Sequence, residues 1–306
     1  MTNITISDKL LKVYTNKNNA IFRSGADQAY SHIEQKGQFG ILYDDFNANP
    51  EILKSWKKDY PEMVVYSVAK RGKTIPMDSK ISFHRNMSTS EYTPESYLSI
   101  DEVTDKDAIY FVKKNGSTGG RGVIACNYDD LQNADIRDCV IQKSMSNPDL
   151  YNNKRYKIRQ LVIIHNNSVY IHKDSWASHS SEDFNTEVDK MREKNVIYQT
   201  SKTPFMLTTN LENFDLIFEN IKKAVCDFAV FYKKEIENII ENEFVILGFD
   251  FVVDTYKNVH IIEINHRSNY AHPEHVSCVC DVGCIRDLII MLVNKTINDT
   301  KLIKCN

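Results

Sequence analysis

Runs of apolar residues separated by polar segments begin the chain in a strand–helix–strand order. Residues 39–46 and 63–69 are apolar runs typical of strands, and residues 49–61 between them have helical spacing with a proline near the start. This order favours a small α/β domain in which the two strands lie parallel. The next segment, residues 71–100, is polar and is expected to be a connection.

The middle of the chain is rich in strand patterns. Residues 108–126 predict a strand, a glycine-rich loop and a second strand, and residues 138–145 predict another short strand. Residues 156–178 predict two strands around a turn at 165–168, and the polar segment 178–210 is expected to be loop-like.

The last third of the chain alternates between helices and a hairpin. Apolar spacing over residues 211–240 predicts a long amphipathic helix, or two of them, and residues 248–268 predict two apolar strands joined by a tight turn. A closing helix is expected from about residue 281 to 294. The predicted class is α+β with a largely antiparallel central sheet.

Composition places the chain among ordinary globular proteins. Its 306 residues are 42% hydrophobic and 26% charged, and the net charge of −3 gives no global field that would steer the chain to nucleic acid or an anionic membrane. The start of the sequence lacks a signal-peptide core, and no apolar run approaches the ~20 residues of a membrane span. We therefore expect a cytoplasmic protein that binds neither nucleic acid nor membrane.

The seven cysteines, an odd number, do not indicate a disulfide framework in a chain of this size and fit a reducing cytosol. Cys278, Cys280 and Cys284, with His272 and His275 nearby, raise the alternative of a zinc site. Because these cysteines run into the apolar pattern of the closing helix, small buried side chains are the favoured interpretation.

Three polar side chains interrupt the apolar strands of the predicted hairpin. A tight turn in the middle of this segment places Asp250 opposite Glu263, and Asn265 opposite Gly248, which has no side chain to crowd it. One face of the hairpin therefore presents Asp250, Glu263 and Asn265 together. Two carboxylates this close repel unless a cation lies between them, and hard oxygen ligands suit Mg2+ shared with nucleotide phosphates.

The alternative for this hairpin is a solvated face, on which polar residues need no purpose. Val252 and Ile261, the other residues predicted to lie on the same face, are apolar and argue against that alternative.

The glycine-rich segment 108–126 suggests a phosphate-binding loop. Its glycines at positions 116, 119, 120 and 122 let backbone N–H groups approach phosphate oxygens, and Lys113 at the strand end supplies a positive charge. The segment is not a Walker A loop, and it is not a Rossmann turn, since a strand follows where a helix should begin. A glycine-rich hairpin without a ligand is the alternative.

Two further strands carry polar residues that suit a nucleotide. Gln142 and Lys143 end a short apolar strand, where side-chain amide and backbone groups can read an adenine edge. Arg155, Lys157 and Arg159 alternate along one strand face, whereas Tyr156 and Ile158 point to the other face. Three cations on one face suggest an anion, because the guanidinium group can bond two phosphate oxygens at once. An exposed basic face is the alternative.

The order of these motifs resembles the ATP-grasp fold and, more specifically, the tubulin–tyrosine ligase and tubulin–tyrosine-ligase-like family. The segment "FVKKNGSTGGRGV" resembles that family's lysine-and-glycine loop, and "RYKIR" its Lys-Phe-Asp-Ile-Arg motif. "LTTN" resembles Leu-Thr-Asn, and "LGFDFVVD…VHIIEIN" is similar to Phe-Gly-x-Asp-Phe…Trp-Leu-Ile-Glu-Val-Asn. The resemblance covers roughly residues 105 to 270.

The resemblance implies ATP-dependent ligation of a carboxylate to an amine through an acyl phosphate. It implies that Arg155 lies near the nucleotide, that Arg159 lies over the γ-phosphate and the acyl phosphate, and that Asp250, Glu263 and Asn265 hold one or two Mg2+. Lys157, between the two arginines on the same strand face, is the third catalytic candidate. The residues that it implies for ATP binding are Lys113, Gly119, Gly120, Arg121, Gly122, Gln142, Lys143, Ser144, Met145 and Asn210.

The chain also departs from the family pattern. Lys157 stands where the family keeps an aspartate, which makes the pocket more positive. A further phosphate-facing arginine has no clear match, and His172 or Lys173 is the candidate substitute. His266 and Arg267 follow the last motif and are expected near the acceptor.

His84 and Arg85 fall roughly where the family carries an early basic residue.

The predicted fold is therefore α+β and ATP-grasp, with two α+β subdomains that clasp ATP. We expect a small N-terminal α/β domain over residues 1–85, a central subdomain with the glycine-rich loop over 86–150, and a C-terminal subdomain with the metal site over 151–306. The expected partners are a protein or peptide acceptor and a free amino acid. An ATP-grasp ligase of small molecules or short peptides, and a catalytically silent nucleotide-binding module, are the alternatives.

Overall fold

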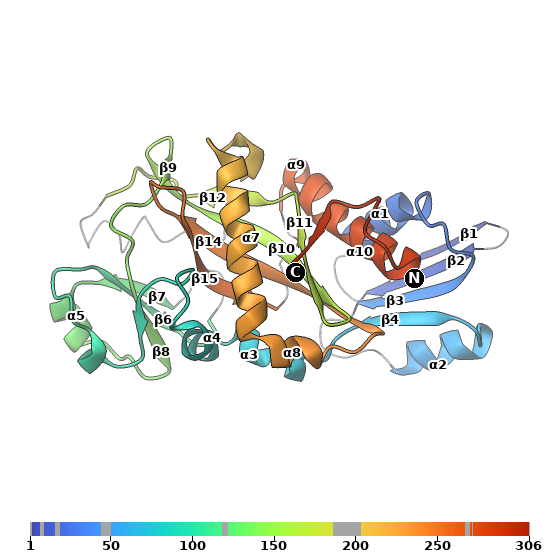
Figure 1. Ribbon diagram of the computed structural model, residues 1–306, viewed down its shortest axis with the longest axis horizontal. Helices are drawn as coiled ribbons and strands as arrows, with labels where there is room; N and C mark the ends of the chain where they lie inside the picture. Colours follow the sequence, from blue (N-terminus) through green and yellow to red (C-terminus); the bar gives the residue numbers. More distant parts are fainter. Residues whose placement is uncertain are drawn as a thin grey trace.

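Two β-sheets organise the computed structural model, a large one through its middle and a four-stranded one at one end (Figure 1). The structure describes residues 2–6, 9–15, 19–43, 50–117, 122–185, 203–266, 270 and 272–305. In these residues the α+β class and the largely antiparallel centre are confirmed. The expected division at residues 85 and 150 stays a prediction.

The N-terminal region forms one wing of the large sheet. Its elements are β1 (Thr2–Ile6), β2 (Lys9–Thr15), α1 (Asn19–Tyr30), β3 (Gly37–Tyr43), α2 (Pro50–Asp59) and β4 (Val64–Val68). Strands β2, β3 and β4 lie parallel, so the predicted strand–helix–strand unit is confirmed. β4 then pairs in parallel with β14, which joins this wing to the centre of the sheet.

The centre of the large sheet is antiparallel. Its strands are β10 (Lys154–His165), β11 (Ser168–His172), β12 (Trp176–His179), β13 (Phe205–Leu207), β14 (Glu243–Val253), β15 (Val259–Asn265) and β16 (Leu302–Lys304). The long strands β10 and β14 pair over eight residues and form its spine. Residues 178–210 were expected to be loop-like, but β13 lies within this segment and pairs with β12, where Trp176 and Met206 are buried.

Helices cover both faces of this spine, as Figure 1 shows for α7. On one face α7 (Phe214–Phe231) and α8 (Lys233–Glu237) pack against the sheet through a continuous apolar cluster. On the other face α1 and α10 (Val282–Asn294) cover only one half of β10 and β14. The other half of that face carries the polar residues of the predicted site.

The four-stranded sheet lies beside that uncovered half. Its strands run in the order β5 (Ser96–Tyr97), β8 (Cys139–Lys143), β6 (Tyr110–Lys114) and β7 (Val123–Cys126), and α5 (Tyr128–Gln132) packs on it. The strands flanking the glycine-rich loop, β6 and β7, are antiparallel as predicted. A short strand, β9 (Leu150–Tyr151), leads from this sheet back to β10.

The segment 71–100, expected to be a connection, contains the helices α3 (Ile75–Asp78) and α4 (Lys80–Met87). Ser79 caps α4 by accepting a hydrogen bond from the Ser82 N–H, and Phe83 and Met87 bury one side of the helix. The helix is short and most of its residues are polar. Two buried apolar residues, Phe83 and Met87, are too few to give a helical periodicity that would predict it from the sequence.

The cysteine-rich segment continues a helix rather than forming a metal cluster. After α9 (Glu274–Val276), residues 277–281 form a π-helical turn that runs into α10, with Cys280 and Cys284 buried and Cys278 exposed. Within the described ranges, no group of three or more His, Cys, Asp or Glu side chains is arranged to hold a metal ion. No helix in the same ranges is long and apolar enough to cross a membrane.

Candidate functional site

Basic residues of β10 line the uncovered half of the sheet face. Arg155, Lys157 and Arg159 share this face, and Tyr156 and Ile158 lie in the apolar cluster on the opposite face. The alternation predicted for this strand is therefore confirmed. The basic face is not solvated, since Arg155 and Arg159 are both buried.

The hairpin register places the three proposed metal ligands together. Asp250 pairs with Glu263 and Gly248 pairs with Asn265, as predicted. Beyond Asp250 the register shifts, because Phe251 pairs with Ile261 and leaves Ile262 as an extra residue.

This bulge corrects one prediction about the same face. Ile261 belongs to the apolar cluster under α7, so its expected place beside the acids is wrong. Ile262 takes that place and lines the site with His260 and Val252. The prediction assumed that side chains alternate strictly along the strand. A bulge inserts one extra residue, and the residues beyond it then lie on the opposite side from the one that strict alternation predicts.

Gly248 makes room for a different neighbour from the one expected. A Cβ atom on this residue would lie 2.8 Å from Nη1 and 3.0 Å from Cδ of Arg159. The space above Gly248 is thus filled by a guanidinium group from β10, while the Asn265 amide reaches only the Gly248 carbonyl at 3.5 Å.

Asp250 is a buried acid held by two cations. Its carboxylate accepts hydrogen bonds from Lys157 Nζ at 2.9 Å, from Arg159 Nη2 at 3.1 Å and from Arg159 Nε. Burial pushes the pKa of Asp250 upward, but Arg159 and Lys157 outweigh it and hold the pKa at about 2. The Arg159 guanidinium also lies 5.5 Å from the centre of the Trp176 ring.

A cavity of about 200 Å3 opens between the large sheet and the four-stranded sheet. Arg155 lines it, is buried, and has its Nη1 atom without a hydrogen-bond partner. Burial lowers the pKa of Arg155 to about 10. Its guanidinium lies 5.2 Å from the centre of the Phe111 ring, and no carboxylate is paired with it in the described ion pairs. A buried cation in this state favours an anionic ligand.

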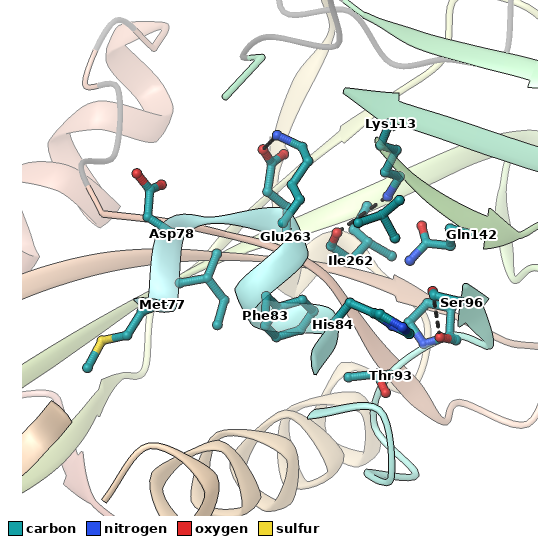
Figure 2. A pocket seen from close by; sticks show the side chains of 14 residues that line it. Met77, Asp78, Phe83, His84, Thr93, Ser96, Lys113, Gln142, Ile262 and Glu263 are labelled. Atoms are coloured by element: carbon teal, nitrogen blue, oxygen red, sulfur yellow. Dashed lines mark hydrogen bonds and ion pairs between the residues drawn. The ribbon is translucent and has the colours of Figure 1, made fainter. Parts of the chain in front are cut away.

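A second, smaller cavity joins the lysine of the glycine-rich hairpin to the proposed metal ligands. Figure 2 shows Lys113 reaching toward the backbone of Ile262, with Gln142 beside them, and Lys113 Nζ donates to the Ile262 carbonyl at 3.3 Å. Burial lowers the pKa of Lys113 to about 8, against the opposing effect of Glu263.

Lys80 of α4 is a site residue that the sequence reasoning missed. Its Nζ lies 3.0 Å from Glu263 Oε1 and donates to the Ser117 carbonyl at 2.7 Å, so it connects the metal face to the glycine-rich loop. His84, one turn later on the same helix, lines the small cavity, and burial lowers its pKa. Arg85 is exposed. The sequence did contain a signal for Lys80, namely the basic residues of this helix. The prediction chose His84 and Arg85, one turn after the lysine that contacts Glu263.

The strand end expected to bind adenine is only partly free to do so. Gln142, Ser144 and Met145 line the 200 Å3 cavity. Lys143 also borders it, but its ammonium pairs with Asp105 at 2.8 Å and Glu95 at 3.2 Å, which raises its pKa. Lys143 therefore holds the strand end in place, and Gln142 and Met145 are better placed to meet a base.

The remaining candidates lie apart from these cavities or outside the described residues. Gly119, Gly120, Arg121 and Arg267 lie outside, while Gly122 closes the loop with a positive φ of 71° that favours glycine. Asn210 is exposed at the end of a 3-10 turn.

Neither His172 nor Lys173 is placed to serve as the missing arginine. His172 is fully buried with its Nε2 atom 3.2 Å from Asp287, and Lys173 is exposed, with its backbone N–H bonded to Lys301. His266 is buried, and its backbone N–H donates to Asp78 at 3.2 Å.

The donors present fit one magnesium ion better than a pair. Glu263 and Asn265 are partly exposed oxygen donors on one strand face, with Glu263 lining the small cavity. Asp250 lies beside them, but both of its oxygens already accept hydrogen bonds from cations. Mg2+ would be held by Glu263 and Asn265, where it would neutralise phosphate charge.

The arrangement of two sheets around this site is that of an ATP-grasp fold. The C-terminal domain of K. lactis Pby1, described as an ATP-grasp enzyme that interacts with the mRNA decapping enzyme Dcp2, is similar over 97% of this chain and 98% of that domain. The TM-score is 0.65 and the sequence identity is 12%.

The chain belongs to the Tubulin-tyrosine ligase family, whose model matches residues 43–200. The match begins earlier than the motifs indicated, and the hairpin with Asp250 and Glu263 lies beyond its end. Tubulin glycylase 3C of Tetrahymena thermophila is 24% identical in an alignment of 196 residues that covers 54% of this chain. The chain spans 18% of that protein's length.

Proposed function

We propose that this protein is an ATP-dependent carboxylate–amine ligase that adds an amino acid to a protein or peptide carboxylate. The observation that carries the proposal is Arg155, a buried guanidinium with an unpartnered nitrogen at the edge of a cavity of about 200 Å3. Burying a cation without a counter-charge costs several kcal/mol, on the order of the penalty for one desolvated ion, and a phosphate group would remove that cost. Membership of the Tubulin-tyrosine ligase family supports ATP as the phosphate source.

In this proposal the nucleotide lies between the two sheets. Gln142 and Met145 meet the adenine, and Phe111 and Ile262 supply apolar cavity walls. Lys113 reaches the phosphates from β6, on the side of the cavity where the glycine-rich hairpin lies.

Glu263 and Asn265 would hold Mg2+, which would offset phosphate charge. Lys80, ion-paired with Glu263, adds a further positive charge from α4.

The proposed reaction needs positioning and charge neutralisation rather than a covalent bond to the protein. An acceptor carboxylate oxygen attacks the γ-phosphorus, the bond to ADP breaks, and an acyl phosphate forms. The amine nitrogen of the amino acid then attacks the acyl carbon, loses a proton, and phosphate leaves. Arg159 and Lys157 keep positive charge beside Asp250, next to the proposed metal ligands, throughout both steps.

The acceptor class rests on the family and on the glycylase named above. A protein named for tubulin glycylation acts on a protein acceptor, and we propose the same kind of acceptor here, with a free amino acid as the second substrate. The cluster of Lys157, Arg159 and Asp250 carries a net charge of +1, and with Lys113 it favours an acidic acceptor segment.

The test is ATP-dependent ADP release with purified tubulin, with acidic peptides, and with free amino acids alone. Glu263→Gln should lower the rate by about 10²-fold, as for the removal of one electrostatic group at a reacting phosphate. Glu241→Gln is the matched control, because Glu241 is exposed and its nearest ion-pair partner, Lys295, is 3.7 Å away. Release with free amino acids alone would point instead to a small-molecule ligase. Equal rates for wild type and Glu263→Gln would exclude Glu263 as a metal ligand.

One observation favours a second candidate, a nucleotide-binding module without catalysis. Lys157 and Arg159, the residues expected at the transferring phosphate, are both bonded to Asp250. If they stay there when nucleotide binds, neither side chain donates a hydrogen bond to the transferring phosphate. Tight binding of a fluorescent ATP analogue, with no ADP release for any acceptor, would support this candidate over the ligase.

A further inference from the structure

Asp250 receives more positive charge than a metal-binding carboxylate usually does. Lys157 Nζ lies 2.9 Å from Oδ2, and Arg159 bonds both oxygens through Nη2 and Nε. The carboxylate is 1% exposed, and the side chain of Lys157 is 13% exposed. One acid and two cations leave this part of the site with a net charge of +1 before any ligand is bound.

Glu263 pairs with one cation rather than two and is more exposed than Asp250. Its cation is Lys80 on α4, a separate element, and its side chain is 24% exposed. Asn265 lies on the same strand face, two residues further, and uses its amide nitrogen rather than its oxygen toward Gly248. A divalent cation at Glu263 would displace Lys80, whose side chain is 10% exposed, but it would leave in place the hydrogen bonds that two cations make to Asp250.

We propose that this site binds one divalent cation, at Glu263 and Asn265, and that the Lys157 ammonium on Asp250 takes the place of a second. The inference rests on the proposed nucleotide function. A second dication at Asp250 would have to displace Lys157 or lie against it, and like charges that close repel strongly in a buried site. Lys157 is held from the same face of β10 as Arg159, so its charge is part of the fold rather than recruited with the nucleotide.

The number of bound ions tests this directly, without a readout of activity. Mn2+ binding is titrated by electron paramagnetic resonance at saturating non-hydrolysable ATP analogue. Wild type should bind one Mn2+ per chain. Lys157→Met should bind two, with the affinity for the second ion raised at least ~10-fold, because the repelling ammonium is gone and Asp250 Oδ2 keeps one hydrogen bond, from Arg159, instead of two. Lys157→Asp, which adds a carboxylate, should bind the second ion more tightly still.

Lys154→Met is the matched control, because Lys154 lies on the same strand and pairs with the exposed Asp183 instead. It should bind one Mn2+, like wild type. Two Mn2+ ions in wild type, or one ion in a folded Lys157→Met variant, would overturn the inference while leaving nucleotide binding intact. Should the variant unfold in a thermal melt, the wild-type count alone decides. Failure of wild type to bind the nucleotide at all would overturn the proposed function as well.

Discussion

One face of β10 and β14 is apolar in one half and charged in the other. Ile163 and Ile246 pair across the two strands under α10, and Arg159 and Asp250 pair across the same two strands a few residues away. Both pairs are buried. The strands and the side-chain alternation are the same, so what differs is the cover: helices over one half, and a second sheet with cavities over the other.

The comparison shows how a buried position comes to tolerate charge. Under α1 and α10, Ile163 and Ile246 belong to an apolar cluster, and the buried His172 of β11 has its polar partner in Asp287 of α10. Beside the four-stranded sheet, Asp250 and Arg159 satisfy each other, whereas Arg155 is left with an unpartnered nitrogen. The charged half therefore contains two kinds of cation: Arg159, which is paired with Asp250, and Arg155, which has a nitrogen without a hydrogen-bond partner.

The largest effect is expected from Asp250→Ala. This change leaves Lys157 and Arg159 buried without their counter-charge, and breaking a buried pair in this way costs about 3–5 kcal/mol. Urea unfolding measures the loss. Asp183→Ala, which breaks the exposed pair with Lys154, should cost no more than ~1 kcal/mol. Similar losses for both variants would mean that the Asp250 cluster is not desolvated in solution.

A cavity created in the apolar half should lower the free energy of unfolding nearly as much as Asp250→Ala does. It should leave the affinity for an ATP analogue unchanged. Ile246→Ala removes a side chain that is 1% exposed, and such truncations cost roughly 2–5 kcal/mol. The affinity for an ATP analogue, measured by calorimetry at a temperature where the variant is folded, should not change. A fall in that affinity would show that the two halves of the face are coupled.

Arg155→Met should separate binding from folding. Loss of one charge-assisted contact to phosphate should weaken the ATP analogue by ~10- to 100-fold. The free energy of unfolding should stay the same or rise, since an under-compensated buried cation is replaced by an apolar chain of similar length. Arg137→Met, at an exposed arginine paired with Asp135, is the control and should change neither quantity. A large loss of stability in Arg155→Met would mean that Arg155 has a structural partner.

The smallest predicted effect is a pH dependence from Lys113. Its pKa of about 8 lies below the usual value because of burial, and the charged groups around it are Glu263, Lys80, Arg155 and Lys157. Affinity for the ATP analogue should fall as the pH rises through 8, by at most ~10-fold per unit, because the ammonium that attracts phosphate is lost.

Folding stability changes in the opposite direction in the same window. A lysine whose pKa is lowered in the folded state binds fewer protons there than when unfolded, so its contribution to stability rises between the folded pKa of about 8 and the ordinary value of 10.5. Lys113→Met should remove both trends. An unchanged affinity of wild type from about pH 7 to about pH 9 would contradict the assignment of Lys113 to the phosphates.

The local sequence pattern was enough to predict the strand register of the hairpin. It was not enough to predict which face of the hairpin each residue lies on. Asp250 opposite Glu263 follows from the turn position and period-two alternation, which act within one pair of strands. The bulge at Ile262 does not, because it depends on how β15 packs under α7 on one side and against the cavities on the other. The prediction for Ile261 was wrong for that reason.

By itself the sequence determined the α+β class, the alternation of the Arg155–Arg159 strand, and the pairing that gathers three oxygen donors, since each depends on residues close together in the chain or on one turn. Only the tertiary structure decided which charges meet. Lys80 reaches Glu263 from a helix more than a hundred residues away, and Arg159 fills the space over Gly248. Such contacts join distant segments across a buried space, and no spacing along the chain encodes that geometry.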